Sequence, residues 1–508
     1  MVAQEASFAK SGLFCEINEA VESLSHIVRQ AAEDGTAIHK VEQRVWDTLL
    51  KIGHLALQQF LDLQGTGDLG ESLTLSDGKQ VKRLEETHER EYVTIFGDFK
   101  IERVVYGSRE GKKIEFVPLD TRLSLPESKF SYLLQDWDQM VSSEEPYNKV
   151  SRFLERILRL EQHVDSLERM SRKMTGDAEA FCWSREAPPA EEEGELLVET
   201  ADGKGVPIRR SADVAPIHDH QHKRGPKPDR KKMATVGSVY SVDRFVRTSQ
   251  EIVDALFRKP HEKRPDWDRP RPRHKHVYAS LTHEDSEGNT IDGQAAVFGW
   301  IADEVKARDP QGIKEKVCIM DGQESLWSTK ACLQENVPMT EVLDLLHVTP
   351  RIWQLAHLFC PGDDAQAEQF VRDRVLRILQ GKVVSVVRGI RQTATRRKLR
   401  AAQREEVRRI CGYFENNQER MGYDVYLKRG YPIASGVIEG ACRHVVKDRM
   451  ERTGMSWSID GARAVLLLRA IFTTDQWDEF MEYRIEHECE RLYPHRSVIE
   501  QVEWYIAA

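Results

Sequence analysis

The sequence lacks any long apolar run. Hydrophobic residues make up 40% of its 508 positions, yet no window of about eighteen residues is apolar enough to cross a bilayer. The first residues also lack the basic start and apolar core that are typical of a secretory signal. We therefore expect a cytoplasmic protein without a membrane partner. Because single domains rarely exceed about 250–300 residues, we expect two or three domains.

Cysteine pairs and several common catalytic motifs are also missing. The eight cysteines are scattered, with no CxxC pair and no Cys/His cluster spaced for zinc, which argues against a disulfide framework or a structural zinc site. Gly203 and Lys204 do not form a phosphate-binding loop, because the GxxxxGK[ST] frame is absent. The sequence offers no convincing Ser/His/Asp or Cys/His arrangement for a side-chain nucleophile.

The charge is unevenly distributed along the chain. The net charge is −9, but residues 1–200 hold 24 basic and 38 acidic side chains, whereas residues 201–508 hold 50 and 45. Residues 371–410 alone carry 13 Lys and Arg against three acids. Such a concentrated positive segment is a candidate binding surface for a polyanion, and a solvated helical face is the alternative.

The N-terminal part is predicted to be mainly helical with a small β element. Apolar residues repeat at i, i+3 and i+4 through the first 65 residues, as in amphipathic helices. Between Tyr92 and Pro118 the pattern alternates and is rich in β-branched residues, which predicts a hairpin or small sheet. Helices are expected again at 128–141 and 148–174. Residues 150–175 are a candidate helix-turn-helix, although packing between helices also explains their apolar stripe.

The C-terminal part has the pattern of a mixed α/β sheet. An acidic, proline-containing linker at 184–194 precedes strands that alternate with helices, which favours a sheet with helices packed on its faces. A long helical region follows the last strand and precedes Glu439. The predicted strands are 195–201, 233–242, 276–282, 316–320 and 341–348.

The expected organisation has six parts. In chain order they are a helical N-terminal region (1–90), a β element with a helical DNA-binding region (91–183), the acidic linker (184–194), the first part of the α/β core (195–349), a helical insertion (350–430), and the rest of the core with its C-terminal helices (431–508).

Three carboxylates fall at comparable places in this predicted sheet. Asp202 follows the first strand of the core and Asp321 follows the fourth, and a glycine comes after each. Open α/β sheets place ligands at the carboxyl ends of their strands. Glu439 lies on a predicted helix. Because hard carboxylate oxygens suit Mg²⁺ or Mn²⁺, two Asp residues and one Glu in this arrangement predict a site for two such ions.

Each acid alone has a simpler interpretation. An Asp before Gly after a strand is most often a turn residue, and Glu439 alone is an ordinary acid on a helix surface. The joint pattern favours the metal site, because all three acids fall at the right steps of one sheet order. Arg443 and Lys447 follow Glu439 at i+4 and i+8, which places them on the same face of an α-helix.

Four separated blocks carry a family resemblance. They are ADGKGVP at 201–207, VCIMDGQESLW at 317–327, DLLHV at 344–348 and GVIEGACRHVVKDRMERTGMSW at 436–457. These blocks resemble, in the same order, the first-Asp block, the second-Asp block, the (C/D)xxH block and the Glu helix of bacterial insertion-sequence transposases of the ISKra type. This family belongs to the Mutator-like DDE group. The resemblance extends over residues 90–470.

The resemblance implies a DNA transposase with an RNase H-like α/β core, an all-helical insertion before the Glu, and a mainly helical DNA-binding region at the N-terminus. It implies that Asp202, Asp321 and Glu439 are the catalytic residues and hold two Mg²⁺ (or Mn²⁺) ions. The partners would be double-stranded DNA, as terminal inverted repeats and target DNA. Because two DNA ends must meet, we expect a homodimer or larger synaptic assembly at the bacterial nucleoid.

Further residues are expected to contact DNA, the basic ones mostly through phosphate. Trp457 would stack on a splayed base, or else is a core residue. Asp344 and His347 would contact DNA or orient the site, or else simply fix the turn after the last strand. The expected nucleic-acid contacts are Lys204, Arg209, Lys223, Arg224, Lys227, Arg271, Arg273, His347, Arg443, Lys447 and Trp457.

Two alternatives remain open for the function. The first is an RNase H-like DNA nuclease or resolvase that cuts without strand transfer. The second is a domesticated, catalytically silent DNA-binding protein. The complete set of three acids argues against the second alternative, because a protein without catalysis has no chemical reason to retain all of them.

Overall fold

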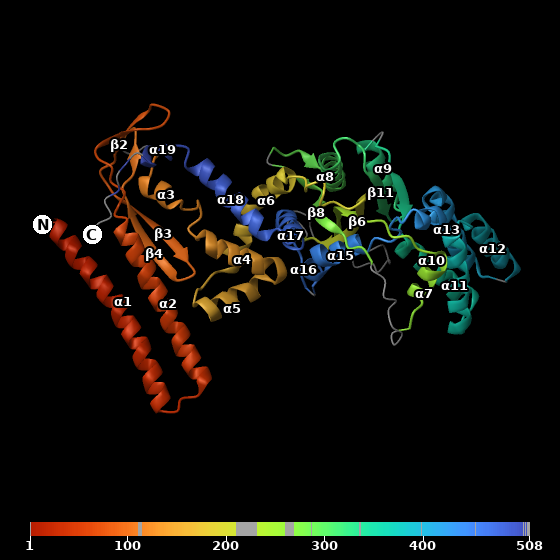
Figure 1. Ribbon diagram of the computed structural model, residues 1–508, viewed down its shortest axis with the longest axis horizontal. Coiled ribbons are helices and arrows are strands. Elements are labelled where there is room, and N and C mark those ends of the chain that lie inside the picture. Colours follow the sequence, from red (N-terminus) through yellow and green to blue (C-terminus); the bar gives the residue numbers. More distant parts are fainter. Residues whose placement is uncertain are drawn as a thin grey trace, which may run out of the picture. The chain divides into compact units, whose positions relative to one another are not determined.

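The chain divides into two compact units, Met1–Lys173 with Asp478–Ala508, and Met174–Trp477. The computed structural model in Figure 1 describes residues 2–109, 114–209, 231–259, 269–285, 287–334, 337–397, 399–452, 454–500, 502 and 504, with side chains from residue 16 onward. Among the helices of these residues, none combines the length and the apolar character that crossing a bilayer requires.

The first unit confirms the predicted long helices and small β element. In β4, Phe99 and Ile101 are buried while Lys100 and Glu102 are exposed, which is the alternation expected of a strand with one covered face. A turn at Arg159 separates α5 from α6, so the predicted helix 148–174 is two helices. The elements are α1 (Val2–Glu33), α2 (Ile38–Leu63), β1 (Ser72–Thr74), β2 (Gln80–Arg83), β3 (His88–Thr94), β4 (Gly97–Arg103), β5 (Tyr106–Gly107), α3 (Pro118–Leu123), α4 (Tyr132–Glu144), α5 (Tyr147–Leu158), α6 (Val164–Ser184, which continues into the second unit), α18 (Trp477–Leu492) and α19 (Ser497–Glu500).

The second unit is built on a five-stranded mixed sheet in the order β12–β11–β6–β7–β8. Strands β6, β11 and β12 are parallel to one another, whereas β7 runs antiparallel to its neighbours β6 and β8. This sheet confirms the predicted α/β class. The strands are β6 (Leu196–Pro207), β7 (Lys231–Val242), β8 (Arg273–Leu281), β11 (Glu315–Met320) and β12 (Thr340–Leu343), and β9 (His283–Glu284) pairs separately with β10 (Thr290–Ile291).

Helices cover both faces of the sheet (Figure 1). On one face, Val198 and Tyr240 belong to the core shared with the helices that follow β12. Gly237 lies three residues from Tyr240 along β7 and therefore faces the opposite side. There helix α8 (Gly293–Arg308) approaches so closely that a Cβ on Gly237 would lie 2.6 Å from Val297 Cγ1. The absence of a side chain at Gly237 thus permits α8 to pack against the sheet.

A block of helices lies between β12 and the segment that carries Glu439, as predicted. It begins earlier than expected, because β12 ends at Leu343 and Asp344 caps α10 by accepting the Leu346 N–H at 2.8 Å. The predicted strand 341–348 is therefore wrong in its second half. The helices are α10 (Leu345–Phe359), α11 (Asp364–Leu379), α12 (Val383–Arg396), α13 (Ala401–Asn416) and α14 (Tyr423–Lys428).

The remaining helices of the second unit are short or lie at its ends. They are α7 (Ser249–Leu256), α9 (Glu324–Leu333), α15 (Gly436–Ala441), α16 (Asp448–Met450) and α17 (Ile459–Phe472). Between α15 and α16, Cys442–Lys447 forms a π-helical segment. The predicted continuous α-helix around Glu439 thus contains a local change of period.

Two predicted boundaries need correction. Strand β6 does not end at residue 201 but continues to Pro207, because from Asp202 onward it still pairs with β7. Residues 185–194 of the predicted linker 184–194 lack regular structure, but the chain divides into its two units within α6 and not within this linker. The end of this segment is held by Glu193, whose buried carboxylate forms a bidentate pair with the buried Arg308 guanidinium, 2.7 Å in each contact.

The Glu193–Arg308 pair predicts a large effect on stability. Glu193→Ala is expected to lower the free energy of unfolding by about 3–5 kcal/mol, because it removes the bidentate partner of the buried Arg308 charge and leaves only the Glu304 carboxylate at 3.7 Å. Glu405→Ala is the control, since Glu405 pairs with Arg408 on the exposed face of α13 and is expected to contribute less than about 1 kcal/mol. Urea unfolding followed by circular dichroism measures both. Similar small shifts would contradict the structural role of the buried pair.

Candidate active site

Seven of the predicted site residues line a single cavity of about 670 Å³ in the second unit. The cavity brings together all three predicted acids and several basic side chains from segments that are far apart in the sequence. These residues are Asp202, Lys204, Asp321, His347, Glu439, Arg443 and Lys447.

Strand register places the two aspartates next to each other. In the parallel ladder between β6 and β11, the last pair is Ala201 with Met320. Asp202 and Asp321 follow directly, so they stand at the same level on neighbouring strands, which lie about 4.8 Å apart. Side chains at equivalent positions of parallel strands point to the same face. The two acids therefore enter the cavity from adjacent strands.

The third acid is positioned by the start of α15. Ser435 caps this helix by accepting the Ile438 N–H at 3.3 Å, and its own N–H donates to Asp344 Oδ2 at 3.1 Å. The Ser435 hydroxyl also lies 3.1 Å from Thr200 Oγ1 on β6. These contacts tie the helix to the sheet one turn before Glu439, and so direct that carboxylate to the cavity.

Asp344 and His347 occupy the first turn of α10. Asp344 is buried and accepts N–H groups from Leu346 and Ser435, which agrees with the alternative that it fixes the turn. Burial raises its pKa to about 6. His347 lies three residues after Asp344, and its Nε2 is 3.2 Å from Glu439 Oε1. The DxxH spacing therefore joins a capping residue to a residue that contacts one of the three acids.

The carboxylates of the cavity influence one another. Burial raises the pKa of Asp202 above its usual value, and the neighbouring Asp321 and Glu439 carboxylates raise it further. The Gly203 N–H opposes this effect by donating to Asp202 Oδ1 at 2.7 Å. Because like charges repel at short distance, a cation between the three acids would favour their ionised forms.

Three carboxylates form a donor set that suits Mg²⁺ or Mn²⁺, which prefer hard oxygen ligands. Each acid already has a partner: Asp202 accepts from Gly203, Asp321 accepts the Gln323 N–H at 2.9 Å, and Glu439 pairs with His347. In the part of the chain that the structure describes, no three His, Cys, Asp or Glu side chains are arranged to hold a metal ion. The acids thus share a cavity and fit the ions by chemistry, and ion binding would require their side chains to rearrange.

Five residues that line the cavity were not predicted as site residues, and Cys442 and His444 are the titratable ones among them. Burial raises the pKa of the Cys442 thiol, and the adjacent Asp202 carboxylate raises it further. In a regular α-helix, His444 would lie well away from the face that carries Glu439, because each residue turns the helix by about 100°. The π-helical segment changes this relation, so that Arg443, His444 and Lys447 all line the cavity.

Other predicted DNA contacts lie elsewhere. Trp457 is buried, and its indole N–H donates to Met450 O at 3.2 Å, which favours the core alternative over base stacking. Arg209 Nε donates to Ser456 O at 2.9 Å, and Arg273 pairs with Asp243 at 2.6 Å. Arg271 lines a separate cavity. Three predicted contacts, Lys223, Arg224 and Lys227, lie outside the described residues.

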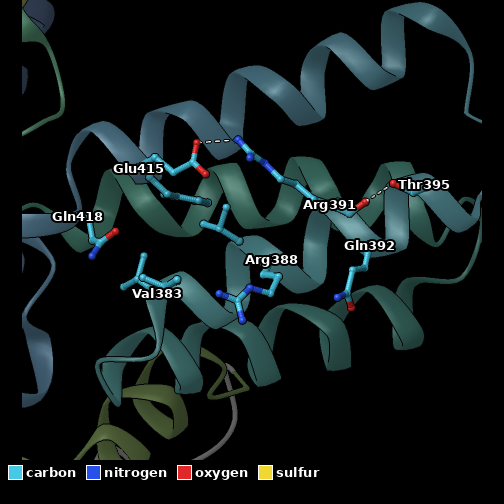
Figure 2. Close-up of a pocket in the computed structure, with 10 residues that line it drawn as sticks. Val383, Arg388, Arg391, Gln392, Thr395, Glu415 and Gln418 are labelled. Carbon is cyan, nitrogen blue, oxygen red and sulfur yellow. Dashed lines mark hydrogen bonds and ion pairs between the residues drawn. The ribbon is translucent and has the colours of Figure 1, made fainter.

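The basic segment 371–410 belongs largely to α11, α12 and α13, and pairing balances part of its charge. Figure 2 shows one such pair, Arg391 with Glu415 at 2.7 Å, beside a cavity of about 380 Å³ between α12 and α13. Arg388 also lines this cavity and has no carboxylate partner among the described residues. The segment therefore keeps some unbalanced positive charge, and its binding of a polyanion stays a prediction.

Comparisons with known proteins do not assign a function to the carboxylate cavity. No protein-family model matches the chain, and no curated protein sequence matches it. The function is therefore inferred from the side chains that line the cavity and from the sequence blocks that carry them.

The carboxylate cavity predicts stabilisation by divalent ions. Mg²⁺ or Mn²⁺ should raise the midpoint of thermal unfolding of the full chain, because binding to the folded state contributes about 2.7 kcal/mol at a hundred times Kd. Asp321→Asn should lose most of this shift. Glu324→Gln is a matched control, since Glu324 is three residues away and does not line the cavity. Equal shifts in Asp321→Asn and the unaltered protein would place the ions elsewhere.

Proposed function

We propose that this protein is a DDE transposase of an insertion sequence, which binds terminal inverted repeats and catalyses metal-dependent DNA cleavage and strand transfer. The main support is the single cavity that collects Asp202 and Asp321 from adjacent strands and Glu439 from a helix. These are the three acids that the family resemblance designates as catalytic. Lys204, Arg443 and other basic side chains in the same cavity suit a polyanionic substrate.

The proposed core is RNase H-like with a helical insertion. This part of the proposal is supported by the mixed five-stranded sheet and by the block α10–α14, which separates β12 from the helix that carries Glu439. Along the chain, Asp202, Asp321, the helical block and Glu439 follow one another in the same order as the corresponding blocks of the family.

The proposed chemistry is in-line displacement at phosphorus. Water first attacks a phosphodiester at the transposon end and leaves a 3′-hydroxyl, which then attacks a phosphodiester of the target DNA. Two divalent ions held by Asp202, Asp321 and Glu439 would supply activation of the attacking oxygen and stabilisation of the leaving oxygen. Neither step needs a side-chain nucleophile, so the role of the protein is to position and stabilise charge.

The other cavity residues have distinct proposed roles. Arg443 and Lys447 would hold phosphate oxygens by charge-assisted hydrogen bonds. The His347 imidazole, 3.2 Å from Glu439, would hold that carboxylate in place, and the Gly203 N–H would do the same for Asp202. Because two transposon ends must be joined in one event, the active form is proposed to be a homodimer or larger assembly.

Cleavage of the DNA that flanks its own gene tests the proposed function. In Mg²⁺ or Mn²⁺ the protein should nick that DNA at a reproducible end and join the resulting 3′-end to a second DNA. Asp321→Asn should reduce the rate by roughly 100-fold or more, whereas Glu324→Gln should not. Gel analysis of labelled strands measures both products.

The products also distinguish the alternatives. Cutting without a joined product would favour a nuclease or resolvase. Tight binding to the transposon end with no cleavage by the unaltered protein would favour a silent DNA-binding protein and reject the catalytic proposal.

Asp344 predicts a separate effect on rate. Asp344→Ala should slow cleavage with little change in DNA affinity, because it removes the acceptor that ties Ser435 to the sheet and so loosens Glu439. Its loss as a helix cap should also cost about 0.5–2 kcal/mol of stability. Asp363→Ala is the matched control, since Asp363 caps α11 through the Gln366 N–H and does not line the cavity. Equal cleavage rates in the two variants would contradict a positioning role for Asp344.

A further inference from the structure

A second large cavity of the second unit is rich in arginine. Its volume is about 580 Å³, and it is lined by the end of β7, by residues on either side of the 248–268 segment, and by residues from 430 to 437. Arg247, Arg269 and Arg271 are part of its lining. Sequence analysis singled out only Arg271 among these three, and Arg247 lies in a different segment of the chain.

The positive charge of this cavity is not balanced by its own acids. Asp243 also lines it, but its carboxylate pairs with Arg273 at 2.6 Å. Within the described residues, Arg247, Arg269 and Arg271 form no ion pair. The Glu251 carboxylate attracts the Arg247 guanidinium and opposes the lowering of its pKa. The same carboxylate also accepts hydrogen bonds from the Thr248 N–H at 2.7 Å and the Thr248 hydroxyl at 2.8 Å.

Arg247 is held in place by the protein before any ligand binds. Its backbone N–H donates to Leu427 O at 3.3 Å, its Nε donates to Phe245 O at 3.0 Å, and an Nη donates to Tyr431 O. A guanidinium has five N–H donors, and the remaining ones have no acceptor among the described residues. Arg247 therefore combines a fixed orientation with free donors.

Electrostatics disfavour this arrangement of arginines in the absence of an anion. Burial lowers the pKa of Arg247 to about 10, and repulsion from Arg269 adds to this effect. A guanidinium normally stays charged far above neutral pH, so the lowered pKa shows that burial and the Arg269 charge outweigh the attraction of the Glu251 carboxylate. A bound anion would supply compensating negative charge.

The arginine cavity adjoins the carboxylate cavity along one helix. Gly436 and Val437 line the arginine cavity, whereas Glu439 and Gly440 line the carboxylate cavity. An α-helix rises 1.5 Å per residue, so Val437 and Glu439 are separated by only about 3 Å along the axis of α15. Because each residue turns the helix by about 100°, these two residues lie on opposite sides of α15, so the two cavities flank this helix and one DNA strand must cross it to contact both.

We propose that the arginine cavity binds a backbone phosphate of the DNA strand whose scissile bond lies in the carboxylate cavity. This inference rests on the proposed function and adds a second contact point for the same substrate. Guanidinium groups match phosphate oxygens in a bidentate manner, and phosphate contacts fix the register of a strand without reading its bases. Arg247 provides the fixed donor, and Arg269 and Arg271 provide the surrounding charge.

Binding of DNA without cleavage tests this inference. A labelled duplex from the flank of the gene is titrated with the full chain in EDTA, and anisotropy is measured at several NaCl concentrations. Arg271→Glu should weaken binding about tenfold and lower the slope of log K against log[NaCl] by about 1. Lys306→Glu is the control with the same charge change, because Lys306 lies on α8, which covers the opposite face of the sheet.

Arg247→Lys tests geometry at constant charge. It should weaken binding while the salt dependence stays near that of the unaltered protein, because the charge remains but the bidentate fork is lost. Equal effects of Arg271→Glu and Lys306→Glu, with no effect of Arg247→Lys, would reject the cavity as a phosphate site. Thermal unfolding of each variant verifies that the comparison is made between folded proteins.

Two further outcomes separate this inference from the proposed function. If the unaltered protein never cleaves but Arg271→Glu and Arg247→Lys both weaken DNA binding as described, the cavity stands and the catalytic proposal fails. If cleavage occurs and both variants bind DNA normally, the cavity proposal fails alone. Calorimetric titration with inorganic phosphate provides a third test. If Arg271→Glu abolishes saturable phosphate binding but leaves the DNA affinity of the protein unchanged, the cavity binds a free anion and the proposed contact with the DNA strand is rejected.

Discussion

The parallel pairing of β6 with β11 is the constraint on which the candidate site depends. Because their ladder ends at Ala201 and Met320, the next residue on each strand is an aspartate at the same level. A shift of one residue would turn one of these side chains to the other face of the sheet. Hydrophobic burial on both faces opposes such a shift, since Val198 and Ile319 lie in the core on one side and α8 packs against the other.

Much of this arrangement could be predicted from local sequence. The alternation of strands and helices gave the α/β class, and the Asp–Gly positions after two apolar strands identified Asp202 and Asp321. Local patterns could not show where β6 ends, because its last residues are kept extended by pairing with β7. They also misassigned the segment after Leu343, where an apolar run suits a strand or a helix equally well until the cap at Asp344 decides.

Features that depend on distant segments were beyond sequence analysis. The pairing of His347 with Glu439 joins α10, the first helix of the helical block, to α15, which follows the block. The arginine cavity similarly combines Arg247 with residues from two other parts of the chain. In both cases the residue types are visible in the sequence, whereas their proximity arises from tertiary packing. The three acids thus line a cavity on one side of α15, together with basic side chains, and the three arginines line the cavity on the other side.

The π-helical segment after α15 has a consequence for how this region tolerates changes in length. An α-helix advances by about 100° per residue, and a π-helical turn accommodates one additional residue within a turn. Deleting a single residue between Cys442 and Lys447 would therefore restore a regular helix, in which Lys447 follows Glu439 at i+7 and still lies on the same face. This segment therefore tolerates the loss of one residue, whereas a second deletion would turn Lys447 by about another 100° and carry it away from the face of Glu439.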